Sequence, residues 1–303
     1  MEATVALACA NVLGEGCFWD AERDTLYWVD VPMPSTLFAW RPDADAEPRR
    51  YPMPQMLTCV RRWGEDLVAA AHGGIHRVDL EDGSLTLVLH PEPDKPFNRC
   101  NDAGTDARGR FWFGTMQNNL CPSATAIDIA SAAGSLYRLD PDLTLHRMER
   151  DVTISNTVCF APDGRTFYFA DTVTGAISAY DLDPERGTIS NRREFARHER
   201  GVPDGSAIDA EGGLWNARWD GRCVVRFAPD GSVDRVVEVP GGQVTSCAFG
   251  GPGLERLYIT TARIGLDAAG LAEEPLAGHL FVCEPGVAGV PAAPFAGPVD
   301  AAR

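Results

Sequence analysis

The chain has 303 residues, of which 45% are hydrophobic and 23% are charged, the proportions of an ordinary globular protein. Its 27 basic and 43 acidic residues give a net charge of −16. Because so acidic a surface repels phosphate backbones, we expect no nucleic-acid partner. No stretch is apolar and long enough to span a bilayer, so we expect no membrane partner either.

The N-terminal run MEATVALACANVL lacks the basic region of a secretory signal. Nine cysteines are scattered along the chain without a C-x-x-C pair, and most lie in apolar, strand-like runs. We interpret them as small buried hydrophobic residues rather than as disulfides or zinc ligands. These features together predict a cytoplasmic protein.

Six times along the chain, a short apolar run meets a turn and continues into an aromatic or β-branched strand. The six passages are CFWDAERDTLYWVD from Cys17, LTCVRRWGEDLVAA from Leu57, GTDARGRFWFGTM from Gly104, VCFAPDGRTFYFADT from Val158, SAIDAEGGLWNARW from Ser206 and SCAFGGPGLERLYITT from Ser246. The second strands of successive passages begin 41 to 56 residues apart, and hairpin-like strand pairs follow, as in residues 74–89. Short strands at this period indicate a β-propeller. We therefore predict an all-β fold, a six-bladed β-propeller that uses residues 1–303 as a single domain.

Residues 4–12 have strand character but precede the first repeat, and the last repeat ends with the strand-like segment 278–285. We expect these two segments to pair and close the ring, which would remove a free sheet edge. Residues 264–272 are expected to hold at most one short turn of helix. Residues 286–303, rich in Ala, Pro and Gly, are expected to form a partly disordered C-terminal tail.

The longest spacing contains an insertion, residues 116–133, which follows the aromatic strand of the third repeat. We expect it to form a loop over one mouth of the propeller channel. Two interpretations stay open, a lid or substrate-contacting loop and a surface loop without a role.

A polar side chain stands ten or eleven residues before the aromatic strand in four of the six repeats. These residues are Glu15, Asn101, Asn156 and Asp204. The nearly constant offset predicts equivalent positions on the innermost strands, close to the propeller axis. Carboxylate and carboxamide oxygens without Cys or His are suited to a hard divalent cation, so the pattern predicts a central metal site.

The alternative is that these residues only form turns, because Asn, Asp and Gly often precede strands for that reason. The Asp204-Gly205 pair alone would be read in this way. Glu15 is not a favoured turn residue, and the shared register of all four favours a site. Other catalytic patterns are missing from the sequence: no G-x-S-x-G or H-E-x-x-H motif occurs, and His72, the histidine nearest a channel strand, is better explained by packing.

Five stretches resemble the regucalcin/gluconolactonase family, the senescence-marker-protein-like sugar lactonases. They are LGEGCFWD around Glu15, NRCNDAGTDARGRFWFGTM from Asn98, GSLYRLD from Gly134, ISNTVCFAPDGRTFYFADT from Ile154 and PDGSAIDAEGGLWNARW from Pro203. The resemblance extends from about residue 13 to residue 281. It implies a six-bladed propeller with one catalytic divalent cation, calcium being favoured over zinc, manganese, magnesium or iron(II).

The resemblance also implies roles for individual residues. Glu15, Asn156 and Asp204 would bind the metal, Asp204 would in addition be the proton donor and acceptor, and Arg99 and Asn101 would bind the sugar. Many relatives carry a Glu shortly after the GTM motif that contacts substrate hydroxyls. This chain has MQNNL there, so Asn119, or with less support Asn118, would take that place.

The function predicted from these features is metal-dependent hydrolysis of an aldonolactone to the aldonic acid. The resemblance includes glucono-, galactono-, arabinono- and xylonolactone among the candidate substrates. Two alternatives stay open: another metal-dependent esterase or organophosphatase on the same scaffold, and a non-enzymatic calcium-binding protein, because fold does not fix function.

Overall fold

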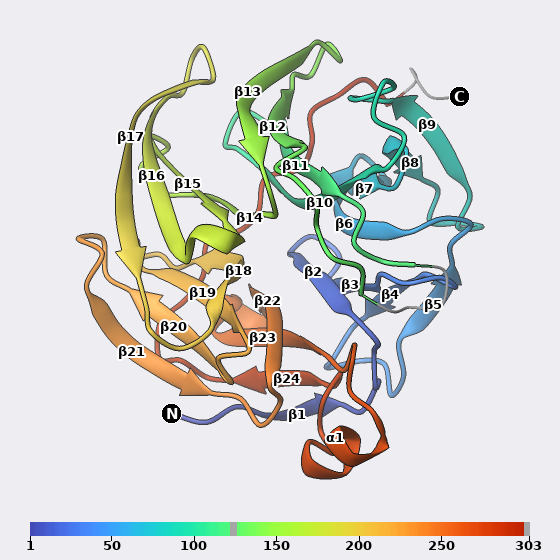
Figure 1. Ribbon diagram of the computed structural model, residues 1–303, viewed down its shortest axis with the longest axis vertical. Helices are drawn as coiled ribbons and strands as arrows, with labels where there is room; N and C mark the ends of the chain where they lie inside the picture. The colour runs from blue at the N-terminus through green and yellow to red at the C-terminus, as the bar shows by residue number, and fades with distance from the viewer. Residues whose placement is uncertain (122–125, 300–303) are drawn as a thin grey trace.

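The computed structural model describes residues 1–121 and 126–299. Six four-stranded antiparallel sheets stand around a common axis, each with its first strand innermost (Figure 1). This arrangement confirms the predicted six-bladed β-propeller. We number the blades one to six in chain order, starting from the sheet that contains β2.

The first three blades each use four consecutive strands. Blade one contains β2 (Gly14–Asp20), β3 (Thr25–Asp30), β4 (Thr36–Trp40) and β5 (Arg49–Pro52). Blade two contains β6 (Leu57–Trp63), β7 (Asp66–Ala71), β8 (Gly74–Val78) and β9 (Leu85–Leu89). Blade three contains β10 (Asn98–Thr105), β11 (Phe111–Gln117), β12 (Gly134–Leu139) and β13 (Leu145–Val152).

Blades four and five repeat this pattern, and blade six combines both ends of the chain. Blade four contains β14 (Ser155–Phe160), β15 (Thr166–Asp171), β16 (Ala176–Asp183) and β17 (Thr188–Arg197). Blade five contains β18 (Val202–Ile208), β19 (Leu214–Trp219), β20 (Cys223–Phe227) and β21 (Val233–Glu238). Blade six contains β22 (Gln243–Gly250), β23 (Arg256–Ala262), β24 (Leu280–Cys283) and β1 (Thr4–Leu7).

The ring closes in blade six as the sequence predicts. Strand β1 pairs antiparallel with β24, with Thr4 opposite Val282 and Val5 opposite Phe281, and the two strands lie side by side at the bottom of Figure 1. The N-terminal strand thus covers the edge of β24 that would otherwise be open to another chain.

Helical structure in the described residues is limited to α1 (Ala268–Glu273) and two 3-10 turns, η1 (Thr172–Thr174) and η2 (Pro252–Leu254). Helix α1 overlaps the segment expected to hold a short turn of helix, and the Asp267 side chain caps it by accepting a hydrogen bond from the Gly270 amide at 2.9 Å. None of the helices in the described residues has the length and apolar character needed to cross a membrane.

In two blades, an aspartate in the turn between the first two strands accepts hydrogen bonds from side chains of the same blade. In blade three, Asp106 accepts hydrogen bonds from the Trp112 indole at 2.9 Å and from the Arg110 guanidinium at 2.6 Å. In blade five, Asp209 accepts from the Trp215 indole at 2.7 Å. These buried pairs explain why the DARGR and DAEGG turns precede aromatic strands, since an indole N–H inside a core needs an acceptor.

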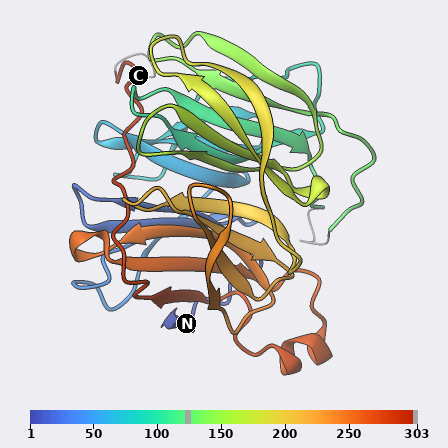
Figure 2. The same ribbon diagram turned by 90° about the vertical axis from the view of Figure 1, so that its left-hand side faces the viewer.

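The C-terminal segment does not behave as expected. The composition of residues 286–303 predicts partial disorder, but residues 286–299 cross one face of the ring in a defined path, as the red trace in Figure 2 shows. The Gly289 amide bonds the Leu254 carbonyl at 2.9 Å, the Phe295 amide bonds the Arg62 carbonyl at 2.7 Å, and the Ala296 amide bonds the Gly109 carbonyl at 2.9 Å. Composition missed this because the partners of the segment belong to four distant blades.

Phe295 anchors this segment, and its truncation should destabilise the whole ring. Its side chain is 2% exposed and packs against Trp63, with ring centroids 5.2 Å apart. We expect Phe295→Ala to lower the free energy of unfolding by roughly 3 to 5 kcal/mol, since it leaves a cavity between blades two and three. Chemical denaturation would measure the loss. The control is Val233→Ala on an exposed position of β21, which should change stability by less than about 0.5 kcal/mol.

Candidate functional site

Each of the six innermost strands is interrupted by an irregularity at the same depth. The register shifts lie between Glu15 and Phe18, Leu57 and Cys59, Cys100 and Ala103, Asn156 and Cys159, Pro203 and Ser206, and Val244 and Ser246. A β-bulge turns a side chain away from the regular alternation of a strand. The four polar residues with constant spacing stand at these bulges, which explains how they leave the sheets and face the axis.

The two carboxamides contact each other directly. Asn101 Nδ2 donates to Asn156 Oδ1 at 3.0 Å and to the Ser155 carbonyl at 2.8 Å. Arg99 lies behind them, with its Nη1 donating to Asn101 Oδ1 at 2.6 Å and its Nη2 donating to Asn119 Oδ1 at 2.9 Å. The structure thus brings four of the predicted residues into one hydrogen-bonded chain that runs from blade four to the loop after β11.

The carboxylates are close enough to oppose one another's ionisation. Desolvation and the charge of Asp102 raise the pKa of Glu15 to about 8. Desolvation and the charge of Glu15 raise the pKa of Asp204 well above its usual value. The nearby Arg99 guanidinium acts in the opposite direction on both but does not overcome the desolvation.

Asp102 is a site residue that the sequence analysis missed. Its Oδ1 accepts a hydrogen bond from the Ala103 amide at 2.8 Å, and its Oδ2 accepts from the Val158 amide of blade four at 2.9 Å. Desolvation raises the pKa of this carboxyl as well. Its place directly after Asn101 was the available signal, but the constant offset singles out only one residue in each repeat.

These residues fit a divalent cation. Asp204 Oδ1 is buried and has no hydrogen-bond partner, which is costly unless a ligand binds there. In the part of the chain that the structure describes, no three His, Cys, Asp or Glu side chains by themselves form a group that could hold a metal. A cation at Asp204 and Glu15 would therefore need the carboxamide oxygen of Asn156 as a further ligand, the set that the family resemblance implies.

Thr172, at the start of η1, determines which end of the Asn156 carboxamide faces the channel. Its hydroxyl donates to the Pro203 carbonyl at 2.8 Å, so its oxygen is left to accept from Asn156 Nδ2 at 2.8 Å. The amide nitrogen of Asn156 is thereby held away from the axis and Oδ1 is left facing it. The same hydroxyl touches the backbone directly before Asp204, so one side chain links two of the candidate metal ligands.

The backbone of Asp204 is fixed from within blades four and five. Thr157 Oγ1 donates to the Asp204 carbonyl at 2.7 Å, and Asn216 Nδ2 donates to it at 3.1 Å. Arg218, which is fully buried, in turn holds Asn216 Oδ1 at 2.9 Å. This support fixes the backbone of Asp204 and leaves its carboxyl oxygen Oδ1 buried without a partner.

The insertion contributes to the site through Asn119. The Asn118 side chain instead bonds within its own loop, to the Leu120 carbonyl at 3.0 Å and the Leu120 amide at 3.2 Å. Of the two asparagines considered from the sequence, Asn119 is therefore the one that reaches Arg99. Residues 122–125 of the insertion lie outside the described residues.

His72 is half-buried, and its backbone forms an isolated bridge with that of Arg99.

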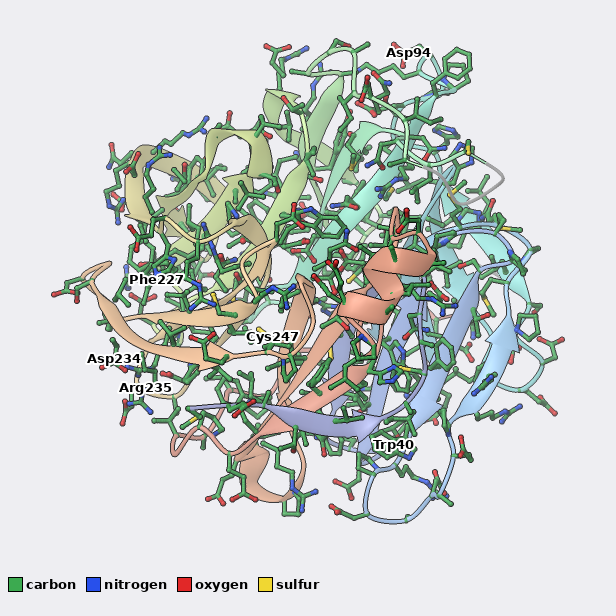
Figure 3. The ribbon with its side chains drawn as sticks, turned by 60° about the horizontal axis from the view of Figure 1, so that its bottom comes forward. Trp40, Asp94, Phe227, Asp234, Arg235 and Cys247 are labelled. Atoms are coloured by element: carbon green, nitrogen blue, oxygen red, sulfur yellow. The ribbon has the colours of Figure 1, made fainter. Side chains whose placement is uncertain are left out.

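A cavity of about 400 Å³ occupies the other half of the channel. It is lined mainly by apolar groups, among them Cys17, Cys159 and Cys247, and residues 290–293 of the C-terminal segment border it. Figure 3 shows Cys247 near the centre of the ring, whereas Asp234 and Arg235 of β21 lie at its outer edge. Since the loop after β11 and helix α1 project from the opposite face (Figure 2), the polar site opens on the face away from the C-terminal segment.

Residues 13–263 match the model of the SMP-30/gluconolactonase/LRE-like region. The chain belongs to this family. Among its relatives, the L-arabinolactonase of Azospirillum brasilense is 39% identical over 302 residues, covering 98% of this chain and 96% of the relative. Regucalcin of Oryctolagus cuniculus is 34% identical over 288 residues, covering 94% and 95%.

Solved structures of SMP-30/gluconolactonase proteins share the fold. Regucalcin of Agrobacterium tumefaciens, described as a calcium-binding protein, superposes with a TM-score of 0.88 at 30% identity, over 97% of both chains. A gluconolactonase of Xanthomonas campestris superposes with a TM-score of 0.74 at 27% identity, over 92% of this chain and 88% of that one. These likenesses establish family membership and the propeller, and they support a sugar lactonase at the level of the family.

Removing the Thr172 hydroxyl should weaken cation binding without removing a ligand. We expect Thr172→Val to lower calcium affinity by about 10- to 100-fold, as the loss of an outer partner of a ligand does, because the Asn156 carboxamide then keeps only its hydrogen bond from Asn101. Thr172→Ser keeps the hydroxyl and should stay within about threefold of the unaltered protein. Calorimetric titration of metal-free protein with calcium chloride measures both. Equal affinities for the Val and Ser variants would contradict this role.

The stability of the metal-free protein should fall as pH rises. The pKa of Glu15 is raised in the folded state to about 8 from an ordinary 4.5, so the folded state binds more protons than the unfolded state between these values. Stabilisation by this proton is complete below pH 4.5 and is lost as pH rises through about 8. We expect a lower melting temperature at pH 8.5 than at pH 5, a shallower dependence in Glu15→Gln, and an unaltered one in Glu65→Gln, whose side chain is exposed.

Proposed function

We propose that this protein hydrolyses an aldonolactone of the glucono-, galactono-, arabinono- or xylonolactone type to the aldonic acid, as a divalent-metal-dependent carboxylic ester hydrolase. Three observations support the proposal: Glu15, Asn156 and Asp204 stand at equivalent bulges of three inner strands, desolvation and the charge of Glu15 raise the pKa of Asp204, and Asp204 Oδ1 is buried without a hydrogen-bond partner. The lactonases among its relatives supply the reaction class.

The proposed cofactor is one divalent cation, held by Glu15, Asn156 and Asp204. Calcium is favoured, because the donors are all oxygens and one structural neighbour is described as calcium-binding. Bound there, it would supply Lewis-acid polarisation of the lactone carbonyl. Glu15 and Asp204 would both be ionised in that state, since a nearby positive charge lowers the pKa of a carboxyl.

Asp204 is the proposed general base. Its free oxygen can take the proton of the attacking water, and the same carboxyl can return it to the ring oxygen when the ester bond breaks. The hydrogen bonds on its backbone carbonyl from Thr157 and Asn216 keep the strand in place during this exchange. A base on a supported strand holds its oxygen at a fixed position, which is what proton transfer requires.

Arg99, Asn101 and Asn119 are proposed to bind the sugar. Arg99 carries an unused donor, Nε, Asn119 offers its Nδ2 as a donor, and the carboxamide oxygens of Asn101 and Asn119 can accept from hydroxyl groups. Because Asn101 already contacts Asn156 at 3.0 Å, a hydroxyl bound by Asn101 would lie beside the reacting carbonyl. This placement favours a small polyhydroxylated lactone as the ligand.

Two alternatives are separated by experiment. The regucalcin likeness favours a role in calcium binding without catalysis, and the scaffold would also suit an aryl-esterase or an organophosphatase. A pH-indicator assay over pentono- and hexonolactones, phenyl acetate and paraoxon, run with several divalent metals, distinguishes all three.

No disulfide joins cysteines within the described residues, which fits the proposed cytoplasmic location.

Loss of the proposed base should abolish turnover. We expect Asp204→Ala to reduce the rate of lactone hydrolysis at least about a thousandfold, because it removes both the proton acceptor and a metal ligand. The pH-indicator assay with excess calcium measures the rate. Asp230→Ala, in the turn of the β20–β21 hairpin, is the matched control and should keep the unaltered rate. A near-normal rate for Asp204→Ala would remove Asp204 from the mechanism.

A further inference from the structure

Five arginines of the described residues have nearly fully buried side chains, and four of them are completely satisfied. Arg110 pairs with Asp106 at 2.6 Å, Arg138 with Asp140 at 2.6 Å, and Arg226 with Asp209 at 2.7 Å. Arg218 has no carboxylate partner, but each of its three nitrogens donates to a backbone or carboxamide oxygen. This chain therefore compensates buried guanidinium groups, as the cost of desolvating a charge demands.

Arg99 is the exception among these five. It is 4% exposed, forms no ion pair with the described carboxylates, and donates only to neutral oxygens, those of the Cys100 backbone, Asn101 and Asn119. Its Nε is buried without any partner. Desolvation lowers the pKa of this guanidinium to about 10, and it still carries a full positive charge at neutral pH.

The carboxylates nearest to Arg99 are the ones proposed to bind the cation. Glu15 and Asp204 favour the charged form of Arg99 from beyond ion-pair distance, and both are the proposed ligands of the cation. Once they bind a cation, Arg99 has no counter-charge of its own. The position best placed to supply one is residue 119, whose side chain touches Nη2 at 2.9 Å, and it is a neutral asparagine.

We propose that Arg99 and Asn119 form a subsite for a carboxylate of the ligand, and that the lactone substrate itself carries a carboxylate, as the lactones of aldaric acids do. The inference rests on the proposed metal-dependent lactone hydrolysis and changes its substrate class, because glucono-, galactono-, arabinono- and xylonolactones carry no carboxylate. Nε and the second hydrogen of Nη2 can both donate to one carboxylate, the paired geometry that guanidinium groups favour. The Asn119 amide can add a third donor.

A carboxylate at this subsite could come from two sources. One is the second acid group of an aldaric-type lactone, and the other is the carboxylate that hydrolysis creates on any aldonolactone. Three acyclic ligands of the same hydroxyl chemistry separate them: D-glucitol has no carboxylate, D-gluconate has one, and D-glucarate has two. In calcium-loaded protein one carboxylate can occupy the cation, and only D-glucarate then has another for Arg99.

The test is calorimetric binding of these three ligands to calcium-loaded and metal-free protein, in the unaltered chain, in Asn119→Glu and in Asn119→Gln. A glutamate at position 119 would pair with Arg99 and exclude a ligand carboxylate. We expect D-glucarate to bind calcium-loaded protein at least about tenfold more tightly than D-gluconate, the advantage of one charge-assisted hydrogen-bonded pair. Asn119→Glu should remove this advantage, and Asn119→Gln should retain most of it.

If D-gluconate and D-glucarate bind equally, both more tightly than D-glucitol and both weakened by Asn119→Glu, the carboxylate subsite stands but its source is the product, and the aldaric substrate class is refuted. If the Glu and Gln variants change all three affinities alike, the subsite is refuted. Melting temperatures of both variants show whether they fold. Hydrolysis assays separate this inference from the proposed function. Failure to hydrolyse both neutral aldonolactones and D-glucarolactone would refute lactone hydrolysis itself, whereas hydrolysis of neutral aldonolactones at least as fast as D-glucarolactone would refute only the aldaric substrate class.

Discussion

Mutual repulsion of carboxyl groups at the centre of the ring is the constraint on which the site depends. Glu15, Asp102 and Asp204 come from three different blades. Besides desolvation, the charge of Asp102 raises the pKa of Glu15, and the charges of Glu15 and Asp102 raise the pKa of Asp204. When these carboxyl groups are ionised and no cation is bound, their repulsion destabilises the fold. Protonation or cation binding removes this repulsion. Two arginines inside the channel, Arg61 and Arg99, offset part of this charge. The negative charge that these arginines do not offset favours cation binding at the centre of the ring.

The scaffold is rigid enough to carry this cost because hydroxyl groups tie neighbouring blades together beside the site. Thr58 of blade two donates to the Asn101 carbonyl of blade three at 2.7 Å, and Thr157 of blade four donates to the Asp204 carbonyl of blade five at 2.7 Å. Thr245 of blade six does the same to Gly14 of blade one. The threonines thus occur in every second blade and hold the backbone of the next inner strand, so the polar side chains point inward from fixed positions.

The two faces of the ring are formed by different parts of the chain. The insertion and the bulged ends of the inner strands form the polar face, where Asn119 meets Arg99. The opposite face is crossed by the C-terminal segment, which contacts strands of blades two, three and five and the η2 turn of blade six. This segment also borders the apolar cavity. Two features therefore close the ring: the pairing of β1 with β24, and the C-terminal segment that crosses one end of the channel.

The sequence by itself determined the number of blades, the pairing of the chain ends and the depth of Glu15, Asn101, Asn156 and Asp204, because each is a local pattern repeated at a regular spacing. It could not decide the partners of Arg99, the role of Asp102 or the path of residues 286–299. Those depend on which distant strands the closed ring places side by side, and on bulges that turn one side chain inward and its neighbour toward the next blade. Local spacing carries no record of such contacts, so only the tertiary structure decided them.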